Sequence, residues 1–375
     1  MPKMTLMQKR EFLMEMCKVR EELRINEQLT QEIIRKHLTF LPHQKLYKFR
    51  ECTDRNFKTL EENCIWMSLA SSFPDPFDNT INIDLKGNAK EIECWLRENW
   101  PVFCFDLAKS LVESRGGVVP YSHTDFIEYA NSCIDKNGDI IAENEHAFLN
   151  AHASPEELEC MDDILQQIKF YREKFAEIED HMVENMSDVI NQTRNRTRES
   201  ALVYCMTERH DNHTLWEIYA KNYTGFCIEY SFRNFAELPF EDYKNLVYMF
   251  PMTYRKKKPY FNMVQLMDSA IRQSIYNDDS WTRDAELDAD LNLQLYYKHS
   301  DYAYEHEWRF SIKAENANNQ QFPFVSAVYA GKDIKPRNLK RLCNIAKKLN
   351  VPVYKQVLNQ ANNGFRYEIV QEATL

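Results

Sequence analysis

Apolar residues follow two different periods along the early part of the chain. Over residues 5–37 they recur at helical spacing, with a break near residues 26–30, and predict an N-terminal helical segment. Residues 45–50 alternate as in a strand, and the apolar run at residues 64–69 predicts a second strand. A short helix over residues 54–63 is expected between the two.

The pattern changes over residues 88–199, which are rich in charged residues and almost free of β-branched runs. Within them, residues 161–190 place apolar side chains at alternating steps of three and four, without Gly or Pro, and predict one long amphipathic helix. We interpret the region as a helical insertion rather than an intermolecular coiled coil, because clean heptads are too few. The insertion is also where we expect a second copy of the chain or an inhibitory partner to bind.

Strand patterns return after the insertion. They cover residues 202–207, 225–230, 308–312, 324–329, 353–358 and 365–370, with helical patterns at residues 216–221, 263–298 and 336–349. The predicted fold class is therefore α+β, with a discontinuous mixed β-sheet core and large helical insertions. We divide the chain into an N-terminal helical segment, residues 1–44, and an α+β domain, residues 45–375.

Composition narrows the functional classes. The net charge of −10 argues against a protein that coats nucleic acid, because such binding depends on clustered Lys and Arg. The seven glycines form neither a Gly-x-Gly-x-x-Gly motif nor a P-loop, so we expect neither of those nucleotide-binding folds. Because no apolar segment matches a signal peptide or a membrane span, we expect a cytoplasmic protein without a membrane partner.

The reactive side chains do not form a recognisable metal or covalent centre. The ten cysteines occur without a Cys-x-x-Cys pair and are interpreted as buried thiols. His210 and His213 lie in a polar stretch without an evident third ligand, so no metal is expected. Ser68, Ser71 and Ser72 lack the Gly-x-Ser-x-Gly elbow of a serine nucleophile.

A stiff turn follows the second predicted strand. Residues 68–78 read Ser-Leu-Ala-Ser-Ser-Phe-Pro-Asp-Pro-Phe-Asp, so that Pro74 and Pro76 flank Asp75. Two prolines so close together restrict the backbone to one path, which an ordinary connection does not need. The turn is therefore expected to form one wall of a site.

Two further polar stretches lie at predicted strand ends. Residues 47–50 read Tyr-Lys-Phe-Arg, and residues 304–309 read Tyr-Glu-His-Glu-Trp-Arg. In an extended strand Glu305, Glu307 and Arg309 share one face, so two carboxylates and a guanidinium would project together. The other interpretation of this triplet is a row of ion pairs on an exposed sheet face.

These stretches resemble the bacterial and phage-associated family DUF2971 over roughly residues 45–331. The resemblance rests on the Lys-x-Arg strand, the Trp-x-Ser strand end, the Phe-x-Asp-Pro-Phe-Asp turn, the Cys-x-Thr strand, Trp216-Glu217-x-Tyr219-Ala220, Gly225-Phe226-Cys227-Ile228-Glu229-Tyr230, residues 304–309 and Tyr329-Ala330-Gly331. The chain departs from the family at Pro74, where Asn is usual, and at residues 205–207, where Cys-Phe-Ser is usual.

The order of these stretches is also similar to the Arg-Ser-Glu layout of ADP-ribosyltransferases, which split the nicotinamide bond of NAD. That similarity implies an ADP-ribosyltransferase-like sheet, NAD as the substrate, and an acceptor that is protein or nucleic acid. Arg50 would hold a phosphate or ribose, Ser68 would brace the nicotinamide pocket, and Glu307 would grip the ribose hydroxyls. The three residues must then converge on one concave surface. The remaining cofactor-binding candidates are Tyr47, Lys48, Trp66, Asp75, Asp78, Trp216, Tyr219, Glu305 and Arg309.

Two functions follow from these observations. The first is an NAD-dependent ADP-ribosyltransferase or NAD glycohydrolase, in the manner of a toxin or phage-defence effector. The alternative is a non-enzymatic binding or sensor protein in which the motifs are structural and the tryptophans are core residues. Residues 255–258, Arg-Lys-Lys-Lys, are the densest basic run and are either a solvated loop or a guide for a nucleic-acid acceptor.

Overall fold

The structure is a computed structural model that describes residues 4–19, 22–84, 195–262, 285–362 and 364–373, with a few isolated positions between them. The chain forms two compact units. The first contains residues 1–81, 194–259 and 288–375, and the second contains residues 82–193 and 260–287.

Most of the predicted insertion falls outside this description. The long helix expected at residues 161–190 lies outside the described residues, and so does the 88–199 region apart from residues 195–199 and isolated positions. Its proposed role in binding a second copy or an inhibitory partner therefore stays a prediction.

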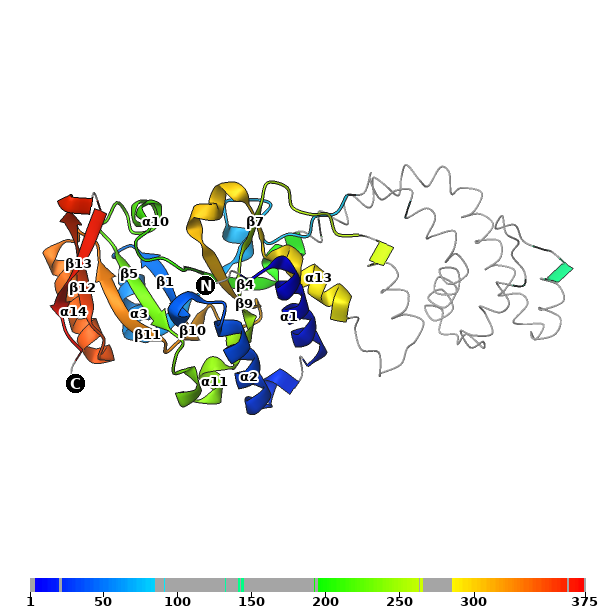
Figure 1. Cartoon of the computed structure of the whole chain (residues 1–375), viewed down its shortest axis with the longest axis horizontal. Helices are drawn as coiled ribbons and strands as arrows, with labels where there is room; N and C mark the ends of the chain where they lie inside the picture. The colour runs from blue at the N-terminus through cyan, green and yellow to red at the C-terminus, as the bar shows by residue number, and fades with distance from the viewer. Residues whose placement is uncertain are drawn as a thin grey trace. The chain divides into compact units, whose positions relative to one another are not determined.

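The centre of the first unit is a mixed sheet of nine strands, which confirms the α+β class (Figure 1). The order across it is β13-β12-β11-β5-β1-β4-β9-β6, and β3 pairs with β4 off this path. These strands span β1 Lys45–Arg50, β3 Ser68–Leu69, β4 Ala201–Thr207, β5 Phe226–Ser231, β6 Met249–Pro251, β9 Glu307–Lys313, β11 Val325–Ala330, β12 Val353–Asn359 and β13 Gly364–Gln371. Within it, β11 and β12 run parallel and the other pairs are antiparallel.

Two small sheets and several helices complete the described elements. The small sheets pair β2 with β10 and β7 with β8. Their strands are β2 Cys64–Trp66, β7 Thr253–Arg255, β8 Tyr297–His299 and β10 Asn319–Gln321. The α-helices are α1 Leu6–Lys18, α2 Glu27–Leu38, α3 Asp54–Glu61, α10 His213–Ile218, α11 Phe240–Tyr243, α13 Ala285–Leu295 and α14 Pro336–Leu349.

The predicted strand at residues 64–69 is wrong as a single element. It divides into β2 and β3, which belong to different sheets. Between them the Met67 N–H donates to the Asn318 carbonyl, so the chain changes partners there. The helical stretch expected at 263–298 also ends earlier, at Leu295, and Lys298 lies in β8. Strands of three residues such as β6, β7, β8 and β10 are too short to show a period in the sequence.

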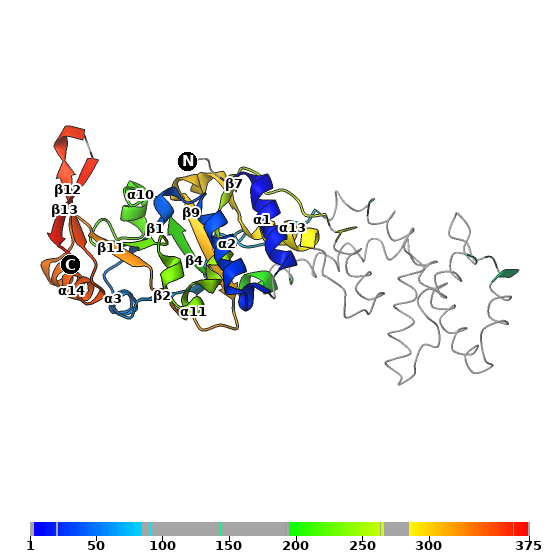
Figure 2. The same cartoon turned by 60° about the horizontal axis from the view of Figure 1, so that its bottom comes forward.

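The N-terminal helices share the core of the sheet. Phe12 of α1 and Ile34 of α2 are almost completely buried, in the same apolar cluster as Phe250 of β6 and Trp308 of β9. Figure 2 shows both helices packed beside these strands. Residues 1–44 are thus part of the same compact unit as the sheet.

A buried lysine lies where α1 meets this sheet. Lys9 is 1% exposed, and its ammonium donates to the Pro251 carbonyl at 2.5 Å and to Thr253 Oγ1 at 2.6 Å. Burial lowers the pKa of Lys9 to about 7. The unfolded chain, with an ordinary lysine pKa, therefore binds more protons than the folded chain between pH 7 and about 10.

This difference predicts a pH dependence of stability. The free energy of unfolding of the wild type, relative to that of Lys9→Met, should increase by a few kcal/mol from pH 7 to pH 10. Chemical denaturation of both proteins across that range measures it. Comparing the two cancels the titration of buried tyrosines and cysteines, which they share. A constant difference across the range would contradict the lowered pKa.

Candidate functional site

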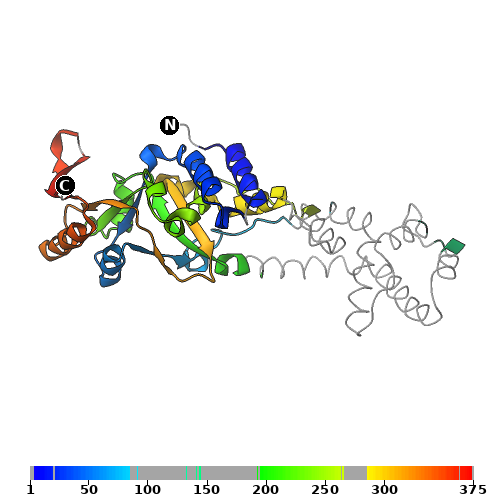
Figure 3. The same cartoon turned by 90° about the horizontal axis from the view of Figure 1, so that it is seen from below.

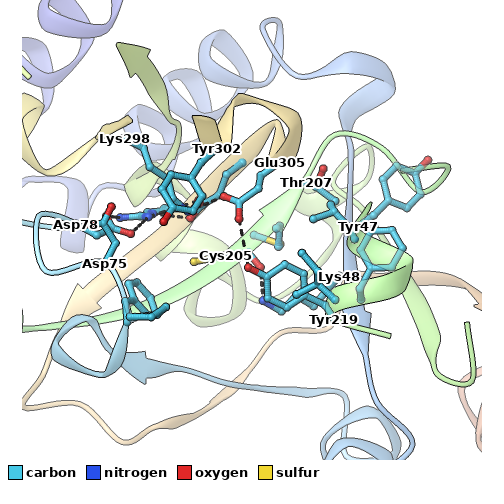
Figure 4. A pocket seen from close by; sticks show the side chains of 18 residues that line it. Tyr47, Lys48, Asp75, Asp78, Cys205, Thr207, Tyr219, Lys298, Tyr302 and Glu305 are labelled. Carbon is cyan, nitrogen blue, oxygen red and sulfur yellow. Dashed lines mark hydrogen bonds and ion pairs between the residues drawn. The ribbon is translucent and has the colours of Figure 1, made fainter. Parts of the chain in front are cut away.

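A pocket of about 370 Å³ opens in the first unit (Figure 4). Its lining residues are Tyr47, Lys48, Phe49, Phe73, Pro74, Asp75, Asp78, Cys205, Met206, Thr207, Leu215, Ile218, Tyr219, Lys298, Tyr302, Glu305, Glu307 and Arg309. They come from β1, β4, β9, α10, the loop after β3 and the segment that follows α13. The lining combines aromatic rings with both signs of charge.

Three neighbouring strands supply the floor of the pocket. In the ladder of β4 with β9, Thr207 faces Glu307 and Cys205 faces Arg309. Tyr47 of β1 faces the same Thr207. Because residues that face each other in a sheet project to the same side, these side chains meet on one face.

Glu305 reaches the pocket by a different route. It ends the 3-10 helix Ser300–Glu305, and β9 begins only at Glu307. His306 between them has a left-handed backbone, with φ 43°. The strand alternation predicted for the triplet therefore holds for Glu307 and Arg309, while a tight turn brings Glu305 beside them.

The stiff turn positions the carboxylate of Asp78. Asp75 Oδ1 accepts a hydrogen bond from the Phe77 N–H at 2.9 Å, which closes a local turn. Arg198 donates to the Phe73 carbonyl at 2.9 Å and to the Asp75 carbonyl at 3.3 Å. The loop is thus held by a hydrogen bond within it and by hydrogen bonds from Arg198, which lies outside it.

At the end of this loop, Asp78 forms a buried bidentate ion pair, or fork, with Arg309. Its two oxygens accept from Arg309 Nη1 and Nη2, both at 2.7 Å. Asp78 is 3% exposed and Arg309 is 1% exposed. A bidentate pair of this kind fixes both groups in position, so the loop after β3 holds the Arg309 guanidinium in place from one side.

Two carboxylates and two cations of the lining form one cluster. Glu307 accepts from Arg309 Nε at 2.6 Å and from Lys298 Nζ at 2.8 Å. Glu305 accepts from Lys298 Nζ at 2.5 Å and from the Tyr219 hydroxyl at 3.2 Å. Lys298 thus bridges the carboxylates, and Arg309 contacts Glu307 but no Glu305 oxygen among the described contacts.

The surroundings move the two carboxyl pKa values in opposite directions. Burial and the nearby charge of Glu307 raise the pKa of Glu305, although Lys298 opposes them. Burial alone would raise the pKa of Glu307, but the charges of Arg309 and Lys298 outweigh it and hold that pKa well below its usual range. Two carboxyl groups with separated pKa values are the arrangement that acid–base chemistry uses.

Lys48 contributes a positive charge without a carboxylate partner among the described residues. Its ammonium donates to the Cys205 carbonyl at 2.5 Å and lies 4.8 Å from the centroid of the Tyr204 ring. This hydrogen bond joins β1 to β4 beside Tyr47 and Thr207, the one residue pair of their ladder. Burial lowers the pKa of Lys48 to about 8.

The thiol in the pocket is unsuited to nucleophilic attack. Burial, followed by the charge of Glu307, raises the pKa of Cys205 to about 12. A nucleophilic cysteine requires the thiolate near neutral pH. Cys205 is therefore a neutral thiol in the floor that donates a hydrogen bond to Glu307.

The structure brings together most of the residues proposed from the sequence. Those in the pocket are Tyr47, Lys48, Asp75, Asp78, Tyr219, Glu305, Glu307 and Arg309. Arg50, Ser68, Trp66 and Trp216 do not line it. The predicted convergence of Arg50, Ser68 and Glu307 on one surface is thus wrong.

The strand geometry explains why these three residues stay apart. Arg50 is the last residue of β1, one position beyond Phe49, the last residue of that strand that lines the pocket, and its guanidinium carbon lies 5.2 Å from the ring centroid of Tyr204. Ser68 pairs with Val203, which is four residues from Thr207. At about 3.3 Å per residue, Ser68 lies on the order of 13 Å along the strand from the level of Glu307.

The two tryptophans outside the pocket have structural positions. Trp66 ends β2 in a small sheet, and the guanidinium carbon of Arg55 lies 5.6 Å from its ring centroid. Trp216 is fully buried, and its indole N–H donates to the His210 carbonyl at 2.8 Å. Trp216 holds α10 against the sheet, so its neighbours Ile218 and Tyr219 can reach the pocket.

Sequence reasoning missed several lining residues, notably Lys298 and Tyr302. Lys298 lay at the end of a predicted helix, and no pattern connected it with Glu305 or Glu307. Cys205 and Thr207 could have been found, because they alternate on a predicted strand within one of the motifs already noted.

Residues 215–310 match the family model DUF2971, described as a protein of unknown function, which supports the family resemblance. The matched segment contains most of α10, the first part of β9 up to Phe310, and the carboxylate cluster. Neither the curated proteins nor the solved structures contain a match to the chain. Within its described part, the chain has no helix that is both long and apolar enough to cross a membrane.

Proposed function

We propose that the pocket binds NAD and cleaves its nicotinamide N-glycosidic bond, as an NAD glycohydrolase or ADP-ribosyltransferase. The observation that carries the proposal is the pair of carboxylates, Glu305 and Glu307, with oppositely shifted pKa values in an aromatic pocket. Breaking this bond builds positive charge on the ribose, which a fixed carboxylate stabilises.

The lining suits the ring that would leave. Tyr47, Phe49, Phe73, Tyr219 and Tyr302 supply aromatic faces and edges. The nicotinamide of NAD is a flat pyridinium cation, and such rings are attracted to aromatic faces as well as to carboxylates. The same pocket attracts neutral nicotinamide less, which favours its release after cleavage.

The two carboxylates take different roles in the proposed step. Glu307, kept ionised by Arg309 and Lys298, faces the developing charge on the ribose carbon. The bond from that carbon to nicotinamide breaks, and its electron pair leaves with the ring nitrogen. The oxygen of water or of an acceptor then bonds to the carbon, and its proton passes to Glu305.

Arg50 and Ser68 have no part in this proposal, because they do not line the pocket. The proposal therefore rests on the chemistry of the pocket and not on the Arg-Ser-Glu layout. In this proposal Lys48, in place of Arg50, binds a phosphate of NAD. An enzyme of this type would act in the cytoplasm, where NAD is available, and would suit a toxin or phage-defence effector.

Lys48 predicts how substrate affinity depends on pH. If its ammonium binds a phosphate of NAD, affinity should fall as the pH rises through about 8, where the group loses its charge. Lys48→Gln should bind NAD about tenfold more weakly at pH 7 and lose this dependence. Titration of NAD binding from pH 6.5 to 9.5 measures both. Lys45→Gln is a control on the same strand, because Lys45 pairs with Glu229 outside the pocket. Identical pH profiles for wild type and Lys48→Gln would remove Lys48 from the binding site.

Release of nicotinamide from NAD by the purified wild-type chain tests the proposal directly. The assay should run with water alone, with a mixture of proteins and with nucleic acid as acceptors. Release with water alone indicates a glycohydrolase, and release that depends on an acceptor indicates a transferase. NAD binding without release under any condition would contradict the enzymatic proposal.

The alternative is a binding or sensor protein. It is favoured by the saturation of the cluster, since Arg309 pairs with Asp78 and Glu307 while Lys298 pairs with Glu305 and Glu307. Groups that satisfy one another in this way also serve to hold strands together. Ligand binding without turnover would support this function.

A further inference from the structure

Helix α14 carries a basic surface that the proposed reaction does not use. Its sequence, Pro-Arg-Asn-Leu-Lys-Arg-Leu-Cys-Asn-Ile-Ala-Lys-Lys-Leu, contains five cations and no acidic residue, within a chain of net charge −10. Its apolar residues Leu342, Ile345 and Ala346 are buried in the core. The helix therefore presents its cations to solvent while its apolar face is already covered.

Helix α3 lies beside α14 (Figure 3), and two of these cations pair with its carboxylates. Arg341 Nη1 lies 2.5 Å from Asp54 Oδ1, and Lys348 pairs with Glu61. The remaining acidic residue of the elements packed against α14 is Glu368 of β13, which pairs with Arg366. These three carboxylates are thus already paired with Arg341, Lys348 and Arg366.

The other cations form one stripe, defined by Lys335 before the helix and by Arg337, Lys340 and Lys347 within it. All four are exposed, and among the described contacts none of them forms an ion pair, although Arg337 acts on Asp54 at longer range. At 1.5 Å and 100° per residue, Arg337 and Lys347 lie about 15 Å apart along the axis, and the three helical positions fall within about 80° around it. The stripe is thus a straight row of exposed positive charge.

We propose that this stripe binds the phosphate backbone of a nucleic-acid duplex. A straight row of cations matches a duplex, whose charges are closely and evenly spaced along its axis. Single strands are bound by stacking on aromatic side chains, and α14 has none. Insertion of α14 into a membrane would require a free apolar face, whereas its apolar face is buried in the core.

The sequence had directed attention to residues 255–258 instead. There the structure ties down two of the four cations, since Lys258 donates to the Thr80 carbonyl and the Arg255 guanidinium carbon lies 5.9 Å from the Tyr297 ring centroid. Lys256 and Lys257 remain exposed. They provide a matched comparison for the stripe.

The test is binding of a fluorescent 20-base-pair DNA duplex between 50 and 200 mM salt. With four phosphate contacts, the logarithm of the affinity should fall against the logarithm of salt with a slope of about −3.6. The triple variant Arg337→Gln, Lys340→Gln, Lys347→Gln should lower the slope to about −1 and weaken binding at 50 mM salt at least tenfold. Its melting temperature should match that of the wild type, because the three side chains are exposed.

The double variant Lys256→Gln, Lys257→Gln should bind the duplex as the wild type does. The proposal is overturned if this variant loses binding while the triple variant keeps it. It is also overturned if the wild type fails to bind duplex at 50 mM salt, or if it binds a polyglutamate peptide or a single strand more tightly than duplex. None of these results depends on NAD cleavage, so the stripe and the pocket are tested separately.

Discussion

Replacement of Glu305 by Gln is expected to slow nicotinamide release from NAD by at least about a hundredfold. The substitution preserves the shape of the side chain and its contact with Tyr219 but removes the group that would accept the proton. The raised pKa of Glu305 brings its basicity closer to neutral pH. Steady-state release of nicotinamide at saturating NAD measures the effect, together with thermal melting.

The companion variant Glu307→Gln separates catalysis from stability. It should lose activity as well, but it should also lower the melting temperature, because Arg309 and Lys298 lose a charged partner in the buried cluster. Glu305→Gln should melt near the wild-type temperature, since it keeps hydrogen bonds to Lys298 and Tyr219. If Glu305→Gln retains wild-type turnover, Glu305 is not the base, and loss of turnover in Glu307→Gln alone would return the role to that residue.

Replacement of Arg309 by Met is expected to lower the free energy of unfolding by about 3–5 kcal/mol. The substitution leaves Asp78 and Glu307 buried without their shared cation. Equilibrium denaturation at pH 7 measures the loss. The loss should shrink toward pH 4, because the stranded carboxylates can then take up protons.

A surface ion pair provides the matched control. Arg366 pairs with Glu368 at 2.7 Å, and both side chains are more than half exposed. Arg366→Gln should therefore change the free energy of unfolding by less than about 1 kcal/mol. If Arg309→Met is no more harmful than this control, the buried fork does not hold the loop after β3 in place.

The sequence determined the main elements of the sheet unit. Alternation predicted β1, a run of strand-forming residues predicted β4, and the start of the basic helix at Pro336 agrees with α14 because a Pro at the first position suits a helix. The Pro-Asp-Pro turn marked a wall of the pocket, since two prolines leave the backbone little freedom. These features depend on residues that are close together in the chain.

Which residues form the site was harder to predict from the sequence. Lys298 meets Glu305 and Glu307 because β7 and β8 pair beside β9, and short strands of this kind carry no period of their own. Asp78 meets Arg309 across 231 positions of sequence. Contacts between residues so far apart are decided by how the strands pair.

The position of Arg50 shows the limit of a linear pattern. Its place at the end of a strand near Lys48 suggested a site residue, but which residues of a strand border a pocket depends on the elements that pack around that strand. Arg50 lies beyond the lining residues of β1 and contacts Tyr204, while a tight turn at His306 brings Glu305 into the pocket. The sequence by itself thus determined which residues form strands, helices and the rigid turn, because these depend on local periodicity and backbone restriction. Tertiary structure alone decided which charges meet, because pairing and burial join segments that are far apart in the chain.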